Sequence, residues 1–406
     1  MMDDIKQFHI KEVIPALSLI MDYQANCSLY HAFRVAVVAY LLSSIVSPKL
    51  KDINFYAGLL HDIGLFETGE HLVTNYKELN FQKTYPPFRN HPITGASIVK
   101  EIPGLSEAVM PILDHHEYFD GSGYPYGKKR EDISTCGQVL RIADSFDLFL
   151  RRKSGIDQRE VSSFIKAGSG REFSPQLCSS FLELDCETLS KIRQEDYLKE
   201  YFCVLVGYIN EPKVKIRNNE RDIFLHILGR AIDGKHHYTN QHSFRVARYA
   251  DKIAEKMELD NESRGRAKAA GYLHDIGKLA IPNSILDKLG PLTQEEWRVI
   301  KTHPKISYEI TNSVKYFKDL KGIVFSAQEE YDGTGYPKGL KAEDIPLEAR
   351  IISVADAVDA MLSDRAYRKA LPLEKAIDEL RENSGTQFDP HVASTAIDLL
   401  NPPSLN

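Results

Sequence analysis

The sequence predicts an all-α protein made of two copies of one helical unit, and two observations lead to this fold class. Apolar residues recur at helical spacing: in the series Val246, Ala250, Ile253 and Met257, steps of four and three place the side chains on one face of a helix. Strand-like alternation flanked by turns is hard to find. Short motifs also recur in the same order in both halves of the chain, at an offset of about 212 residues. A length of 406 residues, which suggests two or three domains, agrees with a duplication.

The duplication rests on six landmarks that follow one another in the same order in both halves. At this density chance agreement is negligible, so the two halves are tandem repeats. The matching pairs are His31 and His242 (242 − 31 = 211), His61 and His274 (274 − 61 = 213), His91 and His303 (303 − 91 = 212), Gly123 and Gly335 (335 − 123 = 212), Asp144 and Asp356 (356 − 144 = 212), and Gly170 and Gly385 (385 − 170 = 215).

These landmarks divide the chain into a first repeat at 1–195, a connecting segment at 196–222 and a second repeat at 223–406. The connecting segment is polar at both ends but contains the apolar stretch 201–209, so we expect a packed helix there rather than a flexible linker. Two further expectations are local. Pro86 and Pro87 are interpreted as a loop before His91, and Trp297, the only tryptophan, as a packing anchor.

Composition restricts the classes of function. The hydrophobic fraction of 43% is ordinary for a globular protein, and a net charge of −6 argues against a broad basic face for DNA, although it allows a small anionic ligand in a local pocket. The five cysteines are odd in number and contain no CxxC pair, which favours reduced thiols in a cytoplasmic protein. The start of the chain lacks the apolar stretch of a signal peptide, and apolar runs such as 201–209 are shorter than the roughly 20 residues that span a bilayer. We therefore expect no membrane segment.

Seven residues of the first repeat could together bind metal ions. Histidine and carboxylate donors suit iron, manganese or zinc better than calcium or magnesium. Seven donors exceed one tetrahedral site and suit two metals that share a bridging carboxylate. Such a pair can contact the oxygens of a displaced phosphoryl group, and it lowers the pKa of water to roughly 7. The seven candidate ligands are His31, His61, Asp62, His91, His115, His116 and Asp144.

The motifs HxxRVA, HDIG, HP, HHE, DGxGYP and (V/I)AD, in this order, resemble the HD-GYP family, a bacterial branch of the HD phosphohydrolase superfamily. The resemblance covers almost the whole chain, twice. It implies an all-α fold with two or three metals, commonly iron or manganese. It also implies hydrolysis of a cyclic dinucleotide, chiefly cyclic di-GMP, to a linear 5′-phosphorylated product. Some members with tandem repeats prefer 3′3′-cyclic GMP-AMP, and this chain is similar to that type.

The resemblance also implies roles for residues of the first repeat. His61 and Asp62 form the catalytic HD pair, and Asp62 bridges the two metals. One metal would bind His31, His61, Asp62 and Asp144, and the other His91, His115 and His116. The implied substrate contacts are Gly123, Tyr124, Pro125 and Arg141.

The first repeat departs from the family pattern at three positions. Cys27 occupies the place of the glutamate that trinuclear members have, which favours two metals over three. Leu65 replaces the lysine that follows HDIG and would help to hold a substrate phosphate. By the offset, the family arginine before the last aspartate is Gln138 (350 − 212 = 138), and Arg141 is only a near neighbour of that position.

The second repeat departs in the opposite way. It keeps the lysine, as Lys278, but the paired histidines are replaced by Ala327 (115 + 212) and Gln328 (116 + 212). A methyl group cannot bind a metal and glutamine is a weak ligand, so the second metal should be lost. It also keeps Arg350, Asp359, Arg365, Tyr367 and Arg368. The residues left for a residual one-metal site are His242, His274, Asp275 and Asp356.

Three hypotheses of function follow. The leading one is a cyclic dinucleotide phosphodiesterase with its chemistry in the first repeat and a regulatory or structural second repeat. The alternatives are a catalytically weak cyclic-dinucleotide sensor, favoured by Leu65, and an HD nucleotidase that uses a one-metal site in the second repeat. In the family the GYP loop is also implicated in docking diguanylate cyclase domains, and apolar helices often pair as dimers, so both partners are expectations.

Overall fold

The computed structural model describes residues 10–24, 30–67, 86–153, 155–212, 220–234, 241–288, 290–313, 317–364 and 369–401. Within these ranges the regular structure is helical, and the β features are two isolated bridges, between Ser169 and Phe173 and between Ser384 and Phe388. The all-α prediction is confirmed. None of the helices in this described part is long and apolar enough to cross a membrane.

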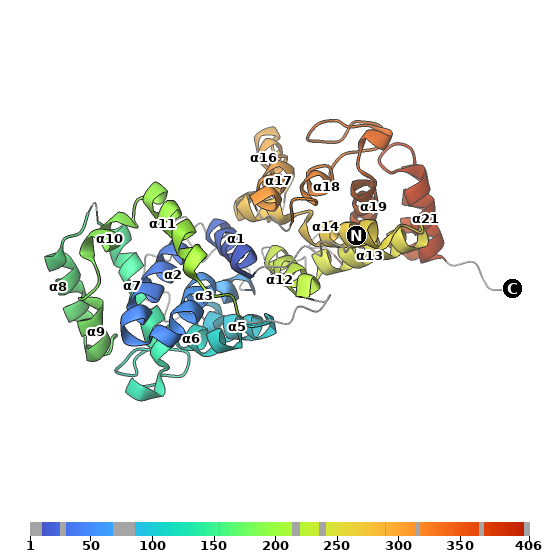
Figure 1. The fold of residues 1–406 in the computed structure, drawn as a ribbon. Coiled ribbons are helices and arrows are strands. Elements are labelled where there is room, and N and C mark those ends of the chain that lie inside the picture. The colour runs from blue at the N-terminus through green and yellow to red at the C-terminus, as the bar shows by residue number, and fades with distance from the viewer. Residues whose placement is uncertain are drawn as a thin grey trace, which may run out of the picture. The chain divides into compact units, whose positions relative to one another are not determined.

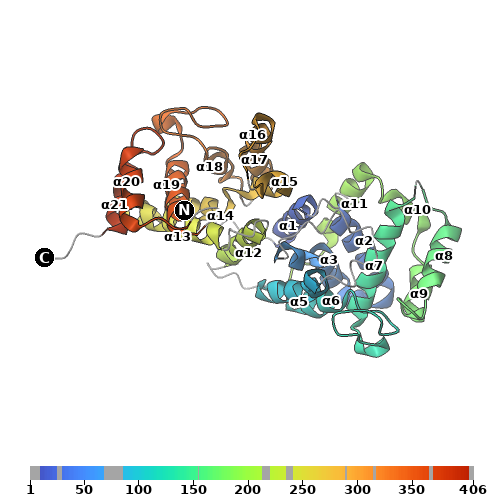
Figure 2. The ribbon, with the colours of Figure 1, turned by 180° about the vertical axis from the view of Figure 1, so that it is seen from behind.

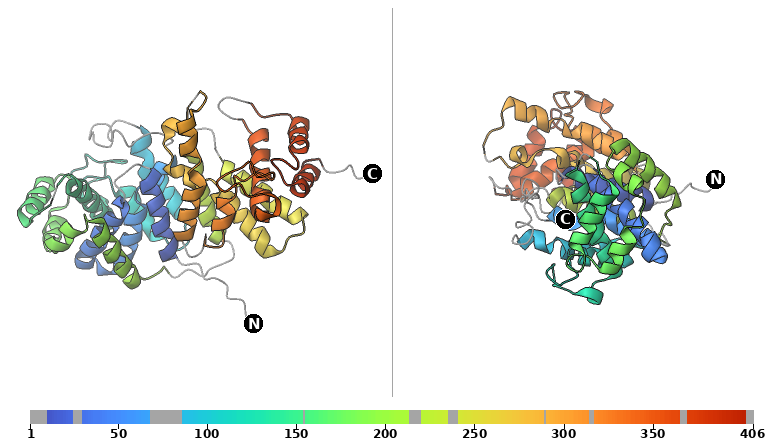
Figure 3. Two further views of the ribbon diagram at one scale, coloured as in Figure 1. Left: turned by 90° about the horizontal axis from the view of Figure 1, so that it is seen from above. Right: turned by 90° about the vertical axis from the view of Figure 1, so that its left-hand side faces the viewer.

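The chain forms two compact units, the first unit at Met1–Glu220 and the second unit at Arg221–Asn406 (Figure 1). Two further views of the ribbon are given in Figure 3, where blue to green marks the first unit and yellow to red the second. The duplication predicted from the motifs is therefore seen as two separate helical bodies.

The first unit carries a central helix, α2, that packs against α3 and α7, while α5, α6 and α7 lie side by side (Figure 2). The predicted helix of the connecting segment is α11, where the Phe202 ring stacks on Phe33 of α2 with centroids 3.9 Å apart. The helices of this unit are α1 (Ile10–Gln24), α2 (His31–Val46), α3 (Lys51–Leu60), α5 (Pro86–Glu101), α6 (Val109–Asp114), α7 (Thr135–Arg151), α8 (Gln158–Gly168), α9 (Pro175–Phe181), α10 (Cys186–Lys191) and α11 (Glu195–Tyr208).

The second unit repeats this plan, with α13 packed against α14 and α19 in the way that α2 packs against α3 and α7. Its helices are α12 (Glu220–Gly234), α13 (His242–Lys256), α14 (Asn261–Leu273), α15 (Asn283–Leu286), α16 (Gln294–Ile300), α17 (His303–Ser313), α18 (Lys321–Phe325), α19 (Leu347–Leu362), α20 (Leu373–Glu382) and α21 (Pro390–Leu400).

A glycine brings the two helices that carry the first ligands into close contact. A Cβ atom at Gly58 of α3 would lie 2.6 Å from the Cα atom of Ala36 in α2, so a larger residue would push the helices apart. The second unit has the same contact, with 2.7 Å between a Cβ atom at Gly271 and the Cα atom of Ala247. This crossing lets the ends of both helices reach one site.

The glycine of the HDIG motif has a comparable role. A Cβ atom at Gly64 would lie 2.0 Å from the carbonyl oxygen of His91, so only glycine lets α5 approach the turn after α3. Gly277 stands in the same relation to His303, also at 2.0 Å. The motif glycine thus brings the third histidine of each unit to the HD pair.

Two local expectations are wrong. Pro86 is the first residue of α5 and does not lie in a loop. Proline is tolerated there because the N–H groups of the first helical turn have no hydrogen-bond partner within the helix. Trp297 of α16 is 47% exposed and therefore does not anchor a core.

Candidate metal centre

The predicted ligands of the first unit lie mostly at helix ends. His31 is the first residue of α2, and Tyr30 before it adopts the left-handed conformation (φ 66°), which turns the chain sharply into the helix. His61 and Asp62 directly follow α3, and His115 and His116 directly follow α6. His91 and Asp144 lie within α5 and α7.

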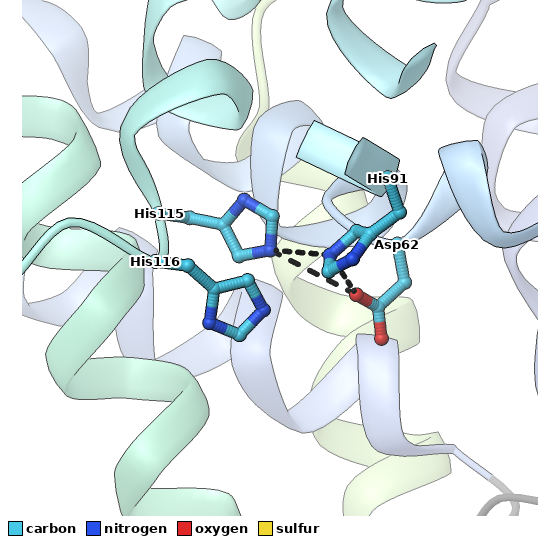
Figure 4. Close-up of side chains that lie close together, drawn as sticks. All are labelled: Asp62, His91, His115 and His116. Carbon is cyan, nitrogen blue, oxygen red and sulfur yellow. Dashed lines mark hydrogen bonds and ion pairs between the residues drawn. The ribbon is translucent and has the colours of Figure 1, made fainter. Parts of the chain in front are cut away.

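The structure brings all seven residues together in two adjoining groups. In each group the candidate ligand atoms lie within 4.8 Å of one another, and every member is buried. We call them the His91 cluster (Asp62, His91, His115 and His116; Figure 4) and the His61 cluster (His31, His61 and Asp144).

Asp62 lies between the two clusters and faces each with a different oxygen. Its Oδ1 atom is 3.3 Å from His91 Nε2 and 3.8 Å from His115 Nε2 (Figure 4). Its Oδ2 atom is 3.4 Å from His61 Nε2 and 3.7 Å from His31 Nε2. One carboxylate therefore has the geometry of a bridge between two ligand sets.

Main-chain carbonyl groups orient three of the histidines. In each, Nδ1 lies close to the carbonyl oxygen three residues earlier: 2.8 Å from Gly58 for His61, 2.5 Å from Phe88 for His91, and 2.6 Å from Ile112 for His115. Because a carbonyl can only accept, Nδ1 carries the proton, and the lone pair of Nε2 is directed into the cluster, where it can bind a metal.

His31 is oriented by a side chain that the sequence analysis missed. Its Nδ1 atom is 2.7 Å from Asp147 Oδ2, and Asp147 also pairs with Arg34 and lies 2.8 Å from Arg151 Nε. Burial alone would lower the pKa of His31, but Asp147 raises it to about 10. The signal was present: Asp359, which bonds His242 at 2.8 Å in the second unit, lies at the common offset (359 − 147 = 212).

The surroundings of His115, His116 and Asp62 hold these three ligands in the protonation state that metals require. It lowers the pKa of His115 to about 4 and holds the pKa of His116 well below its usual range, with repulsion from His115 and Arg141 adding to the effect on His116. Burial opposes ionisation of Asp62, but His61, His115 and His31 hold the pKa of this carboxyl well below its usual range. Neutral imidazole and ionised carboxylate are the ligand forms.

Arg141, predicted to contact substrate, lies behind the ligands and is 4% exposed. Its Nη1 atom is 2.5 Å from His116 Nδ1 and its Nη2 atom donates to Asp144 Oδ2 at 2.9 Å. It also pairs with Glu172, at 3.3 Å between Nε and Oε1. A guanidinium in this position fixes one ligand of each cluster.

The GYP turn is held against the His91 cluster. The Tyr124 ring is 5% exposed and stacks on the His116 ring, with centroids 4.6 Å apart. A Cβ atom at Gly123 would lie 2.2 Å from the Tyr118 nitrogen, so the turn requires glycine. Pro125 follows at an intermediate exposure. The exposed guanidinium of Arg89 lies over the Tyr124 ring, 5.7 Å from its centroid.

Among the described residues of the second unit, the group able to hold a metal is the counterpart of the His61 cluster. His242, His274 and Asp356 offer ligand atoms within 4.8 Å of one another. Asp275, predicted as a fourth member, accepts from Lys278 Nζ at 2.5 Å. In the first unit Leu65 of the turn at Ile63–Glu67 stands where Lys278 does (278 − 65 = 213), so this cation is missing there.

Several predicted residues fall outside the described part of the chain. They are Cys27, Arg365, Tyr367 and Arg368.

Comparison with known proteins identifies the family. A family model described as HD domain matches residues 18–166 and 227–392, which is more than half of the chain. The chain belongs to the HD domain family. Both halves of this HD domain protein are matched, which confirms the resemblance seen in the duplicated motifs.

Curated relatives of this HD domain protein are bacterial phosphodiesterases. It is 34% identical over 303 residues to the 3′3′-cGAMP-specific phosphodiesterase 3 of Vibrio cholerae, covering 73% of this chain and 64% of that protein. It is 35% identical to the cyclic di-GMP phosphodiesterase response regulator RpfG of Xanthomonas campestris, covering 59% of this chain and 61% of that protein. The chain thus spans less than two thirds of either relative.

A solved structure matches more fully. It is a cyclic GMP-AMP-specific phosphodiesterase of V. cholerae, with a TM-score of 0.65 and 25% identity, covering 97% of this chain and 98% of that one.

Proposed function

We propose that this protein is a metal-dependent phosphodiesterase that opens a cyclic dinucleotide in its first unit. The observation that carries the proposal is the pair of buried clusters joined by Asp62, with one carboxylate oxygen toward each. Seven histidine and aspartate donors in this arrangement suit a pair of iron or manganese ions. The relatives, named as phosphodiesterases of cyclic dinucleotides, support the same reaction class.

The residues fit a metal pair by an independent observation. His116 Nε2 and Asp144 Oδ1 are buried and have no hydrogen-bond partner in the described structure. Unsatisfied buried polar atoms are costly, and a bound cation would satisfy them. When bound, the metal pair supplies an activated water and offsets negative charge on the phosphate.

The protein's own residues position the reaction. Asp62 and the six other ligands would hold the metal pair beside the phosphodiester; in the overall reaction water adds to phosphorus, the bond to the 3′ oxygen breaks, and that oxygen takes the proton that the water loses. The product is a linear dinucleotide with a 5′-phosphate. Because Leu65 supplies no cation, we propose that Arg89, exposed beside Tyr124, contacts the substrate phosphate instead.

We propose 3′3′-cyclic GMP-AMP as the preferred substrate. Two cyclic GMP-AMP-specific phosphodiesterases of V. cholerae are similar to this chain over most of its length. One is the solved structure, and the other is a protein that is 25% identical in a match covering 86% of this chain and 82% of that protein. The matches named for cyclic di-GMP cover smaller shares, such as 59% and 40% of this chain.

The test is product analysis by chromatography. Manganese- or iron-loaded protein is incubated with cyclic di-GMP, cyclic di-AMP and both linkage isomers of cyclic GMP-AMP. We expect linear product, fastest from the 3′3′ isomer. Asp62→Ala and His91→Ala should abolish it, and His303→Ala, the matched change in the second unit, should not.

Two outcomes would contradict this assignment. Loss of product with His303→Ala alone would move the chemistry to the second unit. Tight binding of cyclic dinucleotide without any linear product would favour the sensor hypothesis, for which the missing cation at Leu65 is the specific observation.

Partner binding is a further part of the proposal. The GYP turn of the first unit places Tyr126, 60% exposed, on the surface beside the buried Tyr124. We propose this turn as the docking point for a diguanylate cyclase domain, which co-sedimentation of the two proteins tests. We also propose that two chains pair as a homodimer, which light scattering tests.

A further inference from the structure

A cavity of about 370 Å³ lies in the second unit, within the roughly 300–1,000 Å³ typical of small-ligand sites. Its lining includes four residues at positions where the two units differ. Ala327 and Gln328 stand where the first unit has His115 and His116. Ser353 and Gln387 stand where it has Arg141 (353 − 141 = 212) and Glu172 (387 − 172 = 215).

In the first unit the same four positions are filled by large, linked side chains. His115, His116 and Arg141 are buried, and Arg141 joins His116 to Glu172. In the second unit each is replaced by a smaller or uncharged residue. The cavity therefore follows from a coordinated change at four positions, not from the loss of one ligand.

The lining is suited to a flat, uncharged ring that makes hydrogen bonds. Amide groups come from Gln328, Asn383 and Gln387, and apolar surface from Met361 and the partly exposed ring of Tyr336. Glutamine and asparagine amides pair with the edge of adenine through two hydrogen bonds, and aromatic rings stack on bases. A purine base has this chemistry.

The charges of the lining argue against a phosphate inside the cavity. Its ionisable acids include Asp356, Glu330 and Glu379, and no lysine or arginine is among the described residues that line it. A cation lies beside the wall of the cavity: Lys301 is exposed, and its Nζ atom lies 5.0 Å from the ring centroid of Tyr336, which is part of that wall. A nucleotide could thus place its base inside and its phosphate beside Lys301.

We propose that the second unit binds a purine nucleotide, with the base in this cavity and the phosphate toward Lys301. The site is separate from the seven ligands of the first unit and does not depend on their chemistry. It gives the second unit a ligand of its own, through which nucleotide concentration is sensed.

The experiment is calorimetric titration of the 406-residue chain with AMP, GMP and, for comparison, CMP. We expect one saturable site for AMP or GMP and at least tenfold weaker binding of CMP. The double substitution Ser353→Arg with Gln387→Glu copies the pair of the first unit, fills the cavity and should weaken binding at least tenfold. Asp62→Ala, in the other unit, should leave affinity unchanged.

Thermal unfolding shows whether the double variant is folded, and Ala360→Met narrows the cavity from the α19 wall as a second blocking change. The proposal is overturned if neither purine nucleotide binds, if CMP binds equally well, or if folded blocking variants bind as the original chain does. Loss of binding with Asp62→Ala would place the nucleotide in the first unit instead. Absence of phosphodiesterase activity would leave all of these results unaffected.

Discussion

Replacing Asp147 by asparagine tests how far a residue outside the metal ligands controls the centre. Asp147 holds His31 through its Nδ1 atom at 2.7 Å, and asparagine keeps the shape while removing the charge. Loss of such a partner behind a metal-binding histidine lowers metal affinity or activity about 10–100-fold. Burial lowers the pKa of His31 and Asp147 raises it to about 10, so the pKa should fall in the variant.

The same change costs stability, because Asp147 also neutralises Arg34, which is 5% exposed. Removing one partner of a buried ion pair costs about 3–5 kcal/mol, and we expect the lower end because asparagine still accepts a hydrogen bond. Manganese titration, turnover of the cyclic dinucleotide and urea unfolding measure the three effects. Excess manganese should restore much of the turnover.

Asp359→Asn is the matched control, since Asp359 holds His242 of the second unit at 2.8 Å. It should leave turnover unchanged. Wild-type manganese affinity in Asp147→Asn, or an equal loss of turnover in Asp359→Asn, would refute the reasoning.

Three other changes give distinct readouts. Gly58→Ala places a Cβ atom 2.6 Å from α2 and should lower the free energy of unfolding by about 1–3 kcal/mol and also reduce turnover. Gly271→Ala should lower the free energy of unfolding by a similar amount and leave turnover unchanged. Equal turnover in the two variants would contradict the close helix contact. Burial raises the pKa of Asp22 from 3.8 to about 6, so its protonated form favours folding and that stability is lost as pH rises from about 4 to 6. Asp22→Asn should flatten this part of the unfolding profile, and an unchanged slope would exclude Asp22 as its source. Arg89→Ala should raise KM several-fold with little change in kcat, and Arg89→Lys should restore part of it; an effect on kcat alone would argue against a phosphate contact.

The ligand set could be predicted because its members are marked by short motifs that occur twice. The HD pair and the paired histidines each follow a helix directly, so local sequence was enough to place them at chain turns. Their assembly into two groups around Asp62 required the fold, since the seven residues span 31–144.

Roles that depend on packing were harder to predict. Arg141 was predicted to contact substrate because it lies near the position of the family arginine, and packing gives it contacts with His116 and Asp144 that the sequence did not indicate. Trp297, the only tryptophan, was predicted to be a packing anchor, yet it is exposed. Whether a side chain faces ligand, core or solvent is set by neighbours distant in sequence, which a single sequence does not contain.

The carbonyl groups behind the histidines have a consequence for how such a protein can change. A main-chain acceptor cannot be removed by substituting the residue that carries it, so it survives sequence drift. In the second unit His274 and His303 still point Nδ1 at the carbonyl oxygens of Gly271 and Ile300, at 2.9 and 2.8 Å. Their Nε2 atoms remain buried and without hydrogen-bond partners in the described structure. A duplicated copy can therefore lose a metal through a few side chains and keep the framework from which the metal site could be regained.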